Sequence, residues 1–181
     1  MTCAVLNPGG TAPFNMTMLG EALKRRMRAL FADFQLSASN PDLTGGPPLP
    51  EALESVTIYL GSVKSRKRAD DASEVGPKFP IVLVRPRSCT DDNDENGAQR
   101  SIVQVDFAIG VRRLDNDGYA DVTAIVERIR TDLLRSPTIE SRARLELPLD
   151  SEIGDDDSFP QWFGVVSAKF NIPQPVEEVQ P

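Results

Sequence analysis

The sequence predicts an α+β fold, in which a mainly antiparallel sheet of about five strands is packed by two amphipathic helices. Two segments repeat apolar residues at helical spacing, and five shorter segments have the alternation or apolar composition of strands. Prolines and glycines gather between and beyond these segments, at 7–13, 41–50, 76–86 and 173–181. The predicted order is α-β-β-β-α-β-β. The length of 181 residues suits one domain, at 15–172, between a flexible N-terminal arm, 1–14, and a C-terminal tail, 173–181.

The first helix is predicted to begin near Thr17, where Asn15 or Thr17 can cap it. Its apolar face is formed by Leu19, Leu23, Met27, Leu30 and Phe34. The basic residues of "KRRMR" lie elsewhere on the helix. They could form a phosphate-binding patch, but we interpret them as the solvated face of an amphipathic helix.

Three strands are predicted to follow. The first is centred on Val56, Ile58 and Leu60. "FPIVLVRP", at 79–86, is apolar on both faces and is predicted to be a covered central strand that Pro86 ends. The segment 100–113 alternates, with Val103, Val105, Phe107, Ile109 and Val111 on its core face. Long loops are predicted at 37–53, 63–78, 87–99 and 151–159.

The second helix is predicted from about Tyr119 to Pro137, with a core face of Val122, Ile125, Val126, Ile129 and Leu133. The strand at 142–149 is expected to point Leu145, Leu147 and Leu149 inward. In the last strand, Trp162, Gly164, Val166, Ala168, Phe170 and Ile172 share one face. The predicted core anchors are Trp162, Phe163, Phe107 and Ile129. The pair Trp162 and Phe163 could instead lie at a boundary between subunits.

The composition excludes several kinds of chemistry. The chain has no histidine, which removes Ser-His-Asp and Cys-His nucleophiles. Cys3 and Cys89 are interpreted as free thiols. No apolar run is long enough to span a membrane and no signal peptide is evident, so we expect a cytoplasmic protein. The net charge of −7 does not suit nonspecific DNA binding.

Acidic segments provide the strongest metal-binding candidates. "DDNDENG" matches the opening of a calcium loop at Asp92, Asp94, Asn96 and Gly97, but its twelfth position is Val103 instead of glutamate. "GDDDS", at 154–158, could supply paired carboxylates, although no lysine or histidine lies near it in the sequence. No P-loop, G-x-G-x-x-G or G-x-S-x-G pattern occurs. We therefore predict no catalytic residue, no metal site and no cofactor.

Short motifs in the second half of the chain occur in a particular order. They are D-G-Y at 117–119, E-R-I-R at 127–130, L-P-L at 147–149, an acidic loop with a proline, and W-F-G opening a strand that closes on I-P-Q-P. Together with "FPIVLVRP" and "VQVDFAIGV", these motifs resemble the tail terminator (tail completion) proteins of long-tailed bacteriophages. The resemblance covers roughly 79–175. The first 55 residues match less well, and the 37–53 loop and the basic segment 64–68 look like additions.

The resemblance implies a structural virion protein that is not an enzyme. It implies a homo-oligomeric ring, usually a hexamer, that caps the tail tube and ends its polymerisation. The other face of such a ring binds the head–tail connector or stopper protein, and DNA passes through its lumen without specific binding. Such a protein is assembled in the host cytoplasm and ends in the neck of the virion.

Charged segments provide candidate surfaces for these contacts. Six copies at −7 carry −42, and part of that charge could line a lumen and repel phosphate. The candidate lumen-facing residues are Asp91, Asp92, Asp94 and Glu95, or Asp155, Asp156 and Asp157. The candidate contacts with DNA or an acidic partner are Lys64, Arg66, Lys67 and Arg68. We interpret this segment as a mobile loop between strands, because no aromatic residues interleave to stack on bases.

Other functions stay open at this point. One is another neck component, such as a stopper or adaptor. A second is a hydrolase or nuclease that uses carboxylates and a metal. A third is a nucleic-acid-binding regulator.

Overall fold

The computed structural model describes residues 14–37, 53–62, 79–93, 99–113, 117–154 and 160–173. The two helices are α1 (Met16–Leu30) and α2 (Gly118–Arg135). The strands are β1 (Gln35–Ser37), β2 (Leu53–Ser55), β3 (Thr57–Leu60), β4 (Ile81–Asn93), β5 (Gln99–Arg112), β6 (Thr138–Ile139), β7 (Ala143–Ile153) and β8 (Gln161–Ile172).

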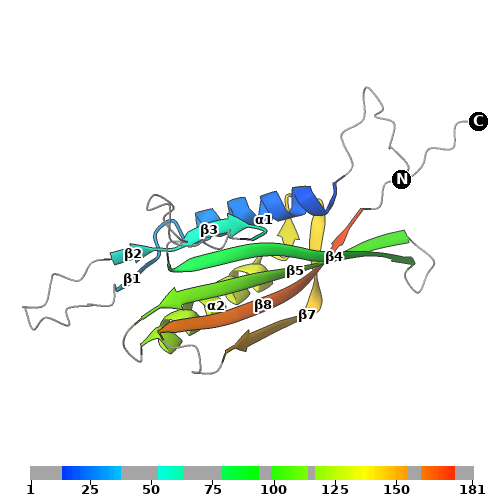
Figure 1. Cartoon of the computed structure of the whole chain (residues 1–181). Coiled ribbons are helices and arrows are strands. Elements are labelled where there is room, and N and C mark those ends of the chain that lie inside the picture. The colour runs from blue at the N-terminus through cyan, green and yellow to red at the C-terminus, as the bar shows by residue number, and fades with distance from the viewer. Residues whose placement is uncertain are drawn as a thin grey trace, which may run out of the picture.

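The strands form one large sheet and one small one. The large sheet has six strands in the order β3-β4-β5-β8-β7-β6, and β1 pairs with β2 in a separate two-stranded sheet. β3 runs parallel to β4, whereas every other pair in the large sheet is antiparallel. In Figure 1 both helices lie behind the large sheet, and α1 contacts β3 and β4 while α2 contacts β5, β7 and β8. The chain is therefore α+β, with two helices on one face of a mostly antiparallel sheet.

The predicted number and order of strands were wrong in detail. The sequence predicted about five strands, whereas the large sheet has six, and β1 and β2 add two more. The extra strands have only two or three residues. A segment this short is held by backbone pairing with its neighbour, so it carries no readable alternation of side chains.

The loop predicted at 87–99 is largely an extended hairpin. β4 continues through Pro86 to Asn93, and β5 begins at Gln99. β3 pairs with β4 only as far as Val84, so among the described strands the later part of β4 pairs with β5 alone. A proline lacks the backbone N–H that would bond to a neighbouring strand. It can remain in an edge strand because there is no strand on the outer side for that N–H to bond. A shift in register between Pro86 and Ser88 accompanies it.

β7 also differs from the prediction. The loop predicted at 151–159 begins later, because β7 extends through Ile153. Leu147, expected to point inward, is 71% exposed. The cause is a shift in the register of β7 against β8 between Glu146 and Asp150, which breaks the inward–outward alternation around Pro148. Leu145 is buried as expected, and Leu149 is partly buried.

The core lies between the sheet and the helices. The predicted core faces of 100–113, the second helix and the last strand are all buried, and Phe107 and Ile129 are fully buried within them. Trp162 is buried at 7% exposure, but the prediction that Phe163 also anchors the core was wrong, because its side chain is 42% exposed. Adjacent residues of a strand point to opposite faces, so only one of the two aromatics can enter a core that lies on one side of the sheet.

Two glycines allow α2 to approach the sheet closely. A Cβ at Gly164 would lie 2.7 Å from Val122 Cγ1, and a Cβ at Gly118 would overlap the indole of Trp162. Gly118 is the first residue of α2, so the Trp162 ring packs directly against the helix backbone there. The close contact explains how a large side chain and a helix share one narrow space.

The N-terminal boundary of the core differs slightly from the prediction. Asn15 caps α1 by accepting a hydrogen bond from the backbone N–H of Met18 at 2.9 Å, as predicted. Phe14, placed in the flexible arm, is instead 5% exposed, and the Arg142 guanidinium lies 5.7 Å from its ring centroid. The remaining residues assigned to the arm, 1–13, lie outside the described part of the chain.

A buried arginine joins β5 to the start of α2. Arg113 follows β5 directly, and its Nε lies 3.1 Å from Oδ2 of Asp121 in the first turn of α2. Its backbone N–H donates to the Pro160 carbonyl at 2.9 Å. Because a buried guanidinium needs a paired carboxylate, this contact also helps to set where α2 begins relative to β8.

We predict that Trp162→Ala lowers the free energy of unfolding by about 3–5 kcal/mol, because it empties a buried aromatic site. Phe163→Ala is the matched control on the other face of the same strand, and should cost less than about 1 kcal/mol. Urea denaturation of both variants measures the two values. Equal losses would show that the two aromatics are not on opposite faces.

We also predict that Gly118→Ala destabilises the fold by about 1–3 kcal/mol through overlap with Trp162. This outweighs the roughly 1 kcal/mol by which alanine is favoured over glycine in a helix. Gly154→Ala is the control, because a Cβ there meets its nearest atom at an ordinary 3.5 Å. A Gly118→Ala protein that melts at or above the temperature of the unaltered chain would contradict the packing described here.

Candidate assembly surface

The face of the large sheet opposite the helices, here called the open face, carries no described helix (Figure 1). One row across it is apolar and consists of Tyr59, Leu83, Ala108 and Val165, which are paired in register from β3 to β8. All four are half-buried. Phe163 is exposed and pairs with Gly110. It lies two residues before Val165 on β8, so the apolar surface continues beyond this row. Such a surface can contribute apolar contacts to a protein interface.

The neighbouring row of the open face is charged. It runs in register through Arg85, Asp106, Ser167 and Asp150, on β4, β5, β8 and β7. Asp106 is held at the centre, because Ser167 Oγ donates to it at 2.9 Å and Arg87 Nε lies 3.3 Å from its other oxygen. The positive charge of the row therefore lies at the β4 edge. The β7 edge carries negative charge that forms no ion pair with a described residue.

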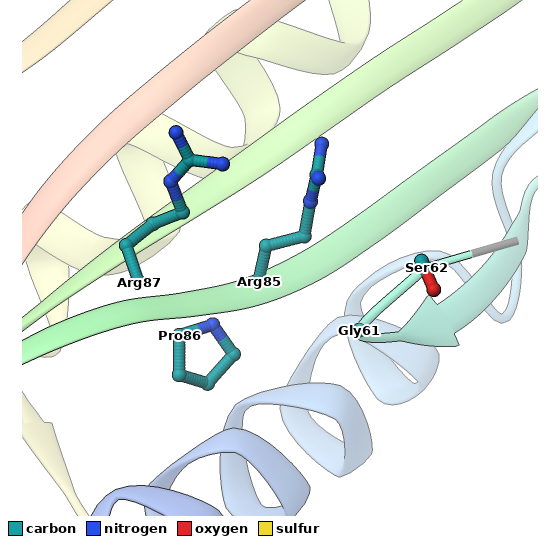
Figure 2. Close-up of a pocket in the computed structure, with 5 residues that line it drawn as sticks. All are labelled: Gly61, Ser62, Arg85, Pro86 and Arg87. Carbon is teal, nitrogen blue, oxygen red and sulfur yellow. The ribbon is translucent and has the colours of Figure 1, made fainter.

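A pocket of about 530 Å³ opens where β3 ends and β4 continues alone. It is lined by Gly61, Ser62, Arg85, Pro86 and Arg87. Figure 2 shows Arg85 and Arg87 pointing to the same side of β4 and Pro86 pointing the opposite way, toward a helix. Two guanidinium groups beside a hydroxyl provide donors for an oxyanion such as a carboxylate or a phosphate.

The two edges of the sheet differ in how readily they can pair with another strand. On β4, residues from Arg85 onward have no outer neighbour within the described part of the chain. On β7, the two-residue β6 covers only Ala143 and Arg144. The uncovered part of β7 contains Pro148 and a shifted register, features that oppose strand addition. We therefore expect another chain to bind the β7 edge through side-chain contacts, and not by adding a backbone-paired strand.

Asp91 and Asp92 are exposed, as a lumen-facing role would need, but they lie on β4 and not in a loop. Asp91 accepts a hydrogen bond from Ser101 Oγ, and Asp92 lies 3.9 Å from Arg100. Arg100 also lies 3.8 Å from Glu146 on β7. These contacts place the two carboxylates beside polar side chains of β5.

The other predicted site residues lie outside the described part of the chain. They are Asp94 and Glu95, Asp155, Asp156 and Asp157, and the basic residues Lys64, Arg66, Lys67 and Arg68. On α1, the considered phosphate patch is partly neutralised, since Lys24 lies 3.5 Å from Glu21 and Arg25 lies 2.6 Å from Glu140.

Sequence reasoning missed the charged edges of the sheet. Arg85 and Arg87 in "VRPR", and Asp150 and Glu152 in "LDSE", each have the i, i+2 spacing that puts two strand residues on one face. That signal was readable. The sequence prediction ends one strand at Pro86 and the other before the acidic run, and therefore places these four residues at strand ends or in loops.

The described residues hold no group of three or more acidic or cysteine side chains placed to bind a metal ion. None of the described helices is long and apolar enough to cross a membrane. No protein-family model matches the chain, and no curated protein matches it.

Cys89 lies on the exposed part of β4, with its Sγ 4.0 Å from Asp91 Oδ1. Partial desolvation, and secondly the negative charge of Asp91, raise the pKa of the Cys89 thiol. A raised pKa leaves less thiolate at any given pH, so we predict slow alkylation near neutral pH. Asp91→Asn, in a Cys3→Ser background, should speed alkylation by iodoacetamide at pH 7.5.

The control for the alkylation experiment is Asp92→Asn, the adjacent residue, whose charge is not among the causes of the shift. It should leave the rate nearly unchanged. If Asp91→Asn and Asp92→Asn gave the same rate, the Asp91 carboxylate would not be the group that acts on the thiol.

Proposed function

We propose that this chain is a tail terminator of a long-tailed bacteriophage, a structural protein whose copies form a ring at the end of the tail tube. The sequence resemblance over 79–175 is the starting point. The observation that carries the proposal is the one-sided construction of the fold, with both helices on one face of the sheet. That construction leaves a half-apolar face and two strand edges available for contact with other copies.

The two edges favour head-to-tail contact. A ring uses heterologous contacts, in which each subunit presents two different surfaces to its neighbours. The β4 edge carries Arg85 and Arg87, and the β7 edge carries Asp150 and Glu152. Surfaces of opposite charge attract each other and repel their own kind, so this pattern supports a directional contact over a symmetric dimer.

The acidity of the chain also supports this role. DNA must pass through the lumen without adhering to it, and a lumen with excess carboxylates repels phosphate. Asp91 and Asp92 on the β4–β5 hairpin are the described residues that could face such a lumen. In this proposal the protein performs no chemistry and holds no cofactor. Its partners are its own copies, the tail tube protein and the head–tail connector or stopper.

The test is to image the purified chain by electron microscopy, alone and after incubation with tail tubes assembled from the tube protein of the same virus. We expect rings, with six subunits by light scattering, or rings formed on tube ends where the tube is needed to start assembly. Tubes capped in this way should stop growing when more tube protein is added.

Two results would contradict the proposal. A chain that stays monomeric both alone and with tubes would not be a ring-forming terminator. A ring that binds the connector protein but leaves tubes growing would indicate a stopper or adaptor instead.

A further inference from the structure

We propose that the pocket at the end of β3 is the receptor for the acidic β7 edge of a second copy, with Arg85 binding Asp150 of the neighbour between the flanking charges of Arg87 and Glu152. The inference rests on the proposed ring and names the residues of its subunit contact. Because the pairing is between different edges, it applies between successive copies around the ring.

The charges on the two edges are complementary and available. Arg87 is 53% exposed and uses its Nε on Asp106, which leaves its terminal nitrogens to bind another carboxylate. Arg85, Asp150 and Glu152 form no ion pair with any residue in the described ranges. The β7 edge therefore presents two carboxylates without an ion-pair partner among the described residues. The β4 edge presents Arg85, which also has none among them, and Arg87, which is shared with Asp106.

Arg85 and Asp150 lie at the same level along the strands. Arg85 is paired in register with Asp106, Asp106 with Ser167, and Ser167 with Asp150. The positive and negative edges therefore lie on the same row of the sheet. β4 and β7 also run antiparallel to each other, since three antiparallel pairings connect them through β5 and β8.

Matching levels favour closure of a ring. When β7 of one copy is placed beside β4 of the next with no shift along the strands, Asp150 lies opposite Arg85. Contacts without such a shift can close on themselves, whereas a shift at each contact would produce an open helical filament. The register of the sheet thus gives a physical reason for a ring.

The end of β3 makes room for the contact. The backbone N–H of Gly61 donates to the Val84 carbonyl at 2.9 Å, and β3 leaves β4 at this point. Glu152 shares a row with Leu83 and Tyr59, so in a neighbouring copy placed without a shift it would lie beside β3, on the side of Arg85 that faces away from Arg87. Guanidinium groups bind carboxylates through two parallel N–H donors, which would fix the neighbour's orientation.

The test is a charge exchange between two variants. The first variant is Arg85→Glu with Arg87→Glu, and the second is Asp150→Arg with Glu152→Arg. Each should fail to form rings by light scattering and electron microscopy under conditions in which the unaltered chain forms them. An equimolar mixture should regain rings, because alternating copies restore opposite charges at every contact. Tail tubes are included if the unaltered chain needs them.

Controls separate the contact from folding and from net charge. Arg28→Glu with Arg135→Glu changes the charge by the same amount on the helical layer, and should leave ring formation intact. Circular dichroism and thermal melting check that each variant folds. If the double substitution at 85 and 87 unfolds the chain by freeing Asp106, the single substitution Arg85→Ala should still weaken assembly, because Arg85 has no described partner to lose.

The outcomes are distinguishable. Rings formed by either double variant alone, or a folded mixture that forms none, would overturn this contact and leave the proposed function standing. If the substitutions at 85 and 87 abolished retention of a duplex DNA oligonucleotide while rings persisted, the pocket would be a phosphate site and the proposal would be wrong. An unaltered chain that never forms rings, even on tubes, would overturn both proposals.

Discussion

β5 and β8 are separated in the chain by α2, β6 and β7, yet they pair at twelve consecutive positions, from Ser101 with Ile172 to Arg112 with Gln161. Their alternating apolar residues form one continuous core face, and the fold depends on this long-range pairing. β4 pairs with the outer side of β5, and β7 pairs with the outer side of β8. α2 covers the core face that β5 and β8 share. A pairing between segments this far apart is slow to form, because the intervening chain must first be closed into a loop.

Burial on one face alone explains the rest of the architecture. Gly164 and Gly118 let α2 lie close to β8, and Trp162 fills the space at the start of the helix. The opposite face receives neither of the two described helices, so Phe163 and the half-buried apolar row stay partly exposed. A monomer can keep such a surface only at some cost in solubility, and the net charge of −7 offsets part of that cost.

The charged row across the sheet connects the fold to the proposed assembly. Residues paired in register lie at the same position along their strands. Through Asp106 on β5 and Ser167 on β8, Arg85 on β4 therefore lies in one row with Asp150 on β7. The interior member, Asp106, is occupied by Arg87 and Ser167, so the charges that remain lie at the edges. An arrangement of this kind gives each subunit two unlike sides, which is the requirement for a ring.

The amino-acid sequence by itself determined the two helices, the core faces of β5, α2 and β8, the cap at Asn15 and the α+β class, because each depends on local periodicity or on one hydrogen bond. It did not determine where β4 and β7 end, because a proline is excluded only from a strand with neighbours on both sides, and charged side chains are tolerated on an edge strand. It also did not place Phe163 outside the core or bring Arg85 level with Asp150. Those relations arise from strand pairing over long separations, and only the tertiary structure decided them.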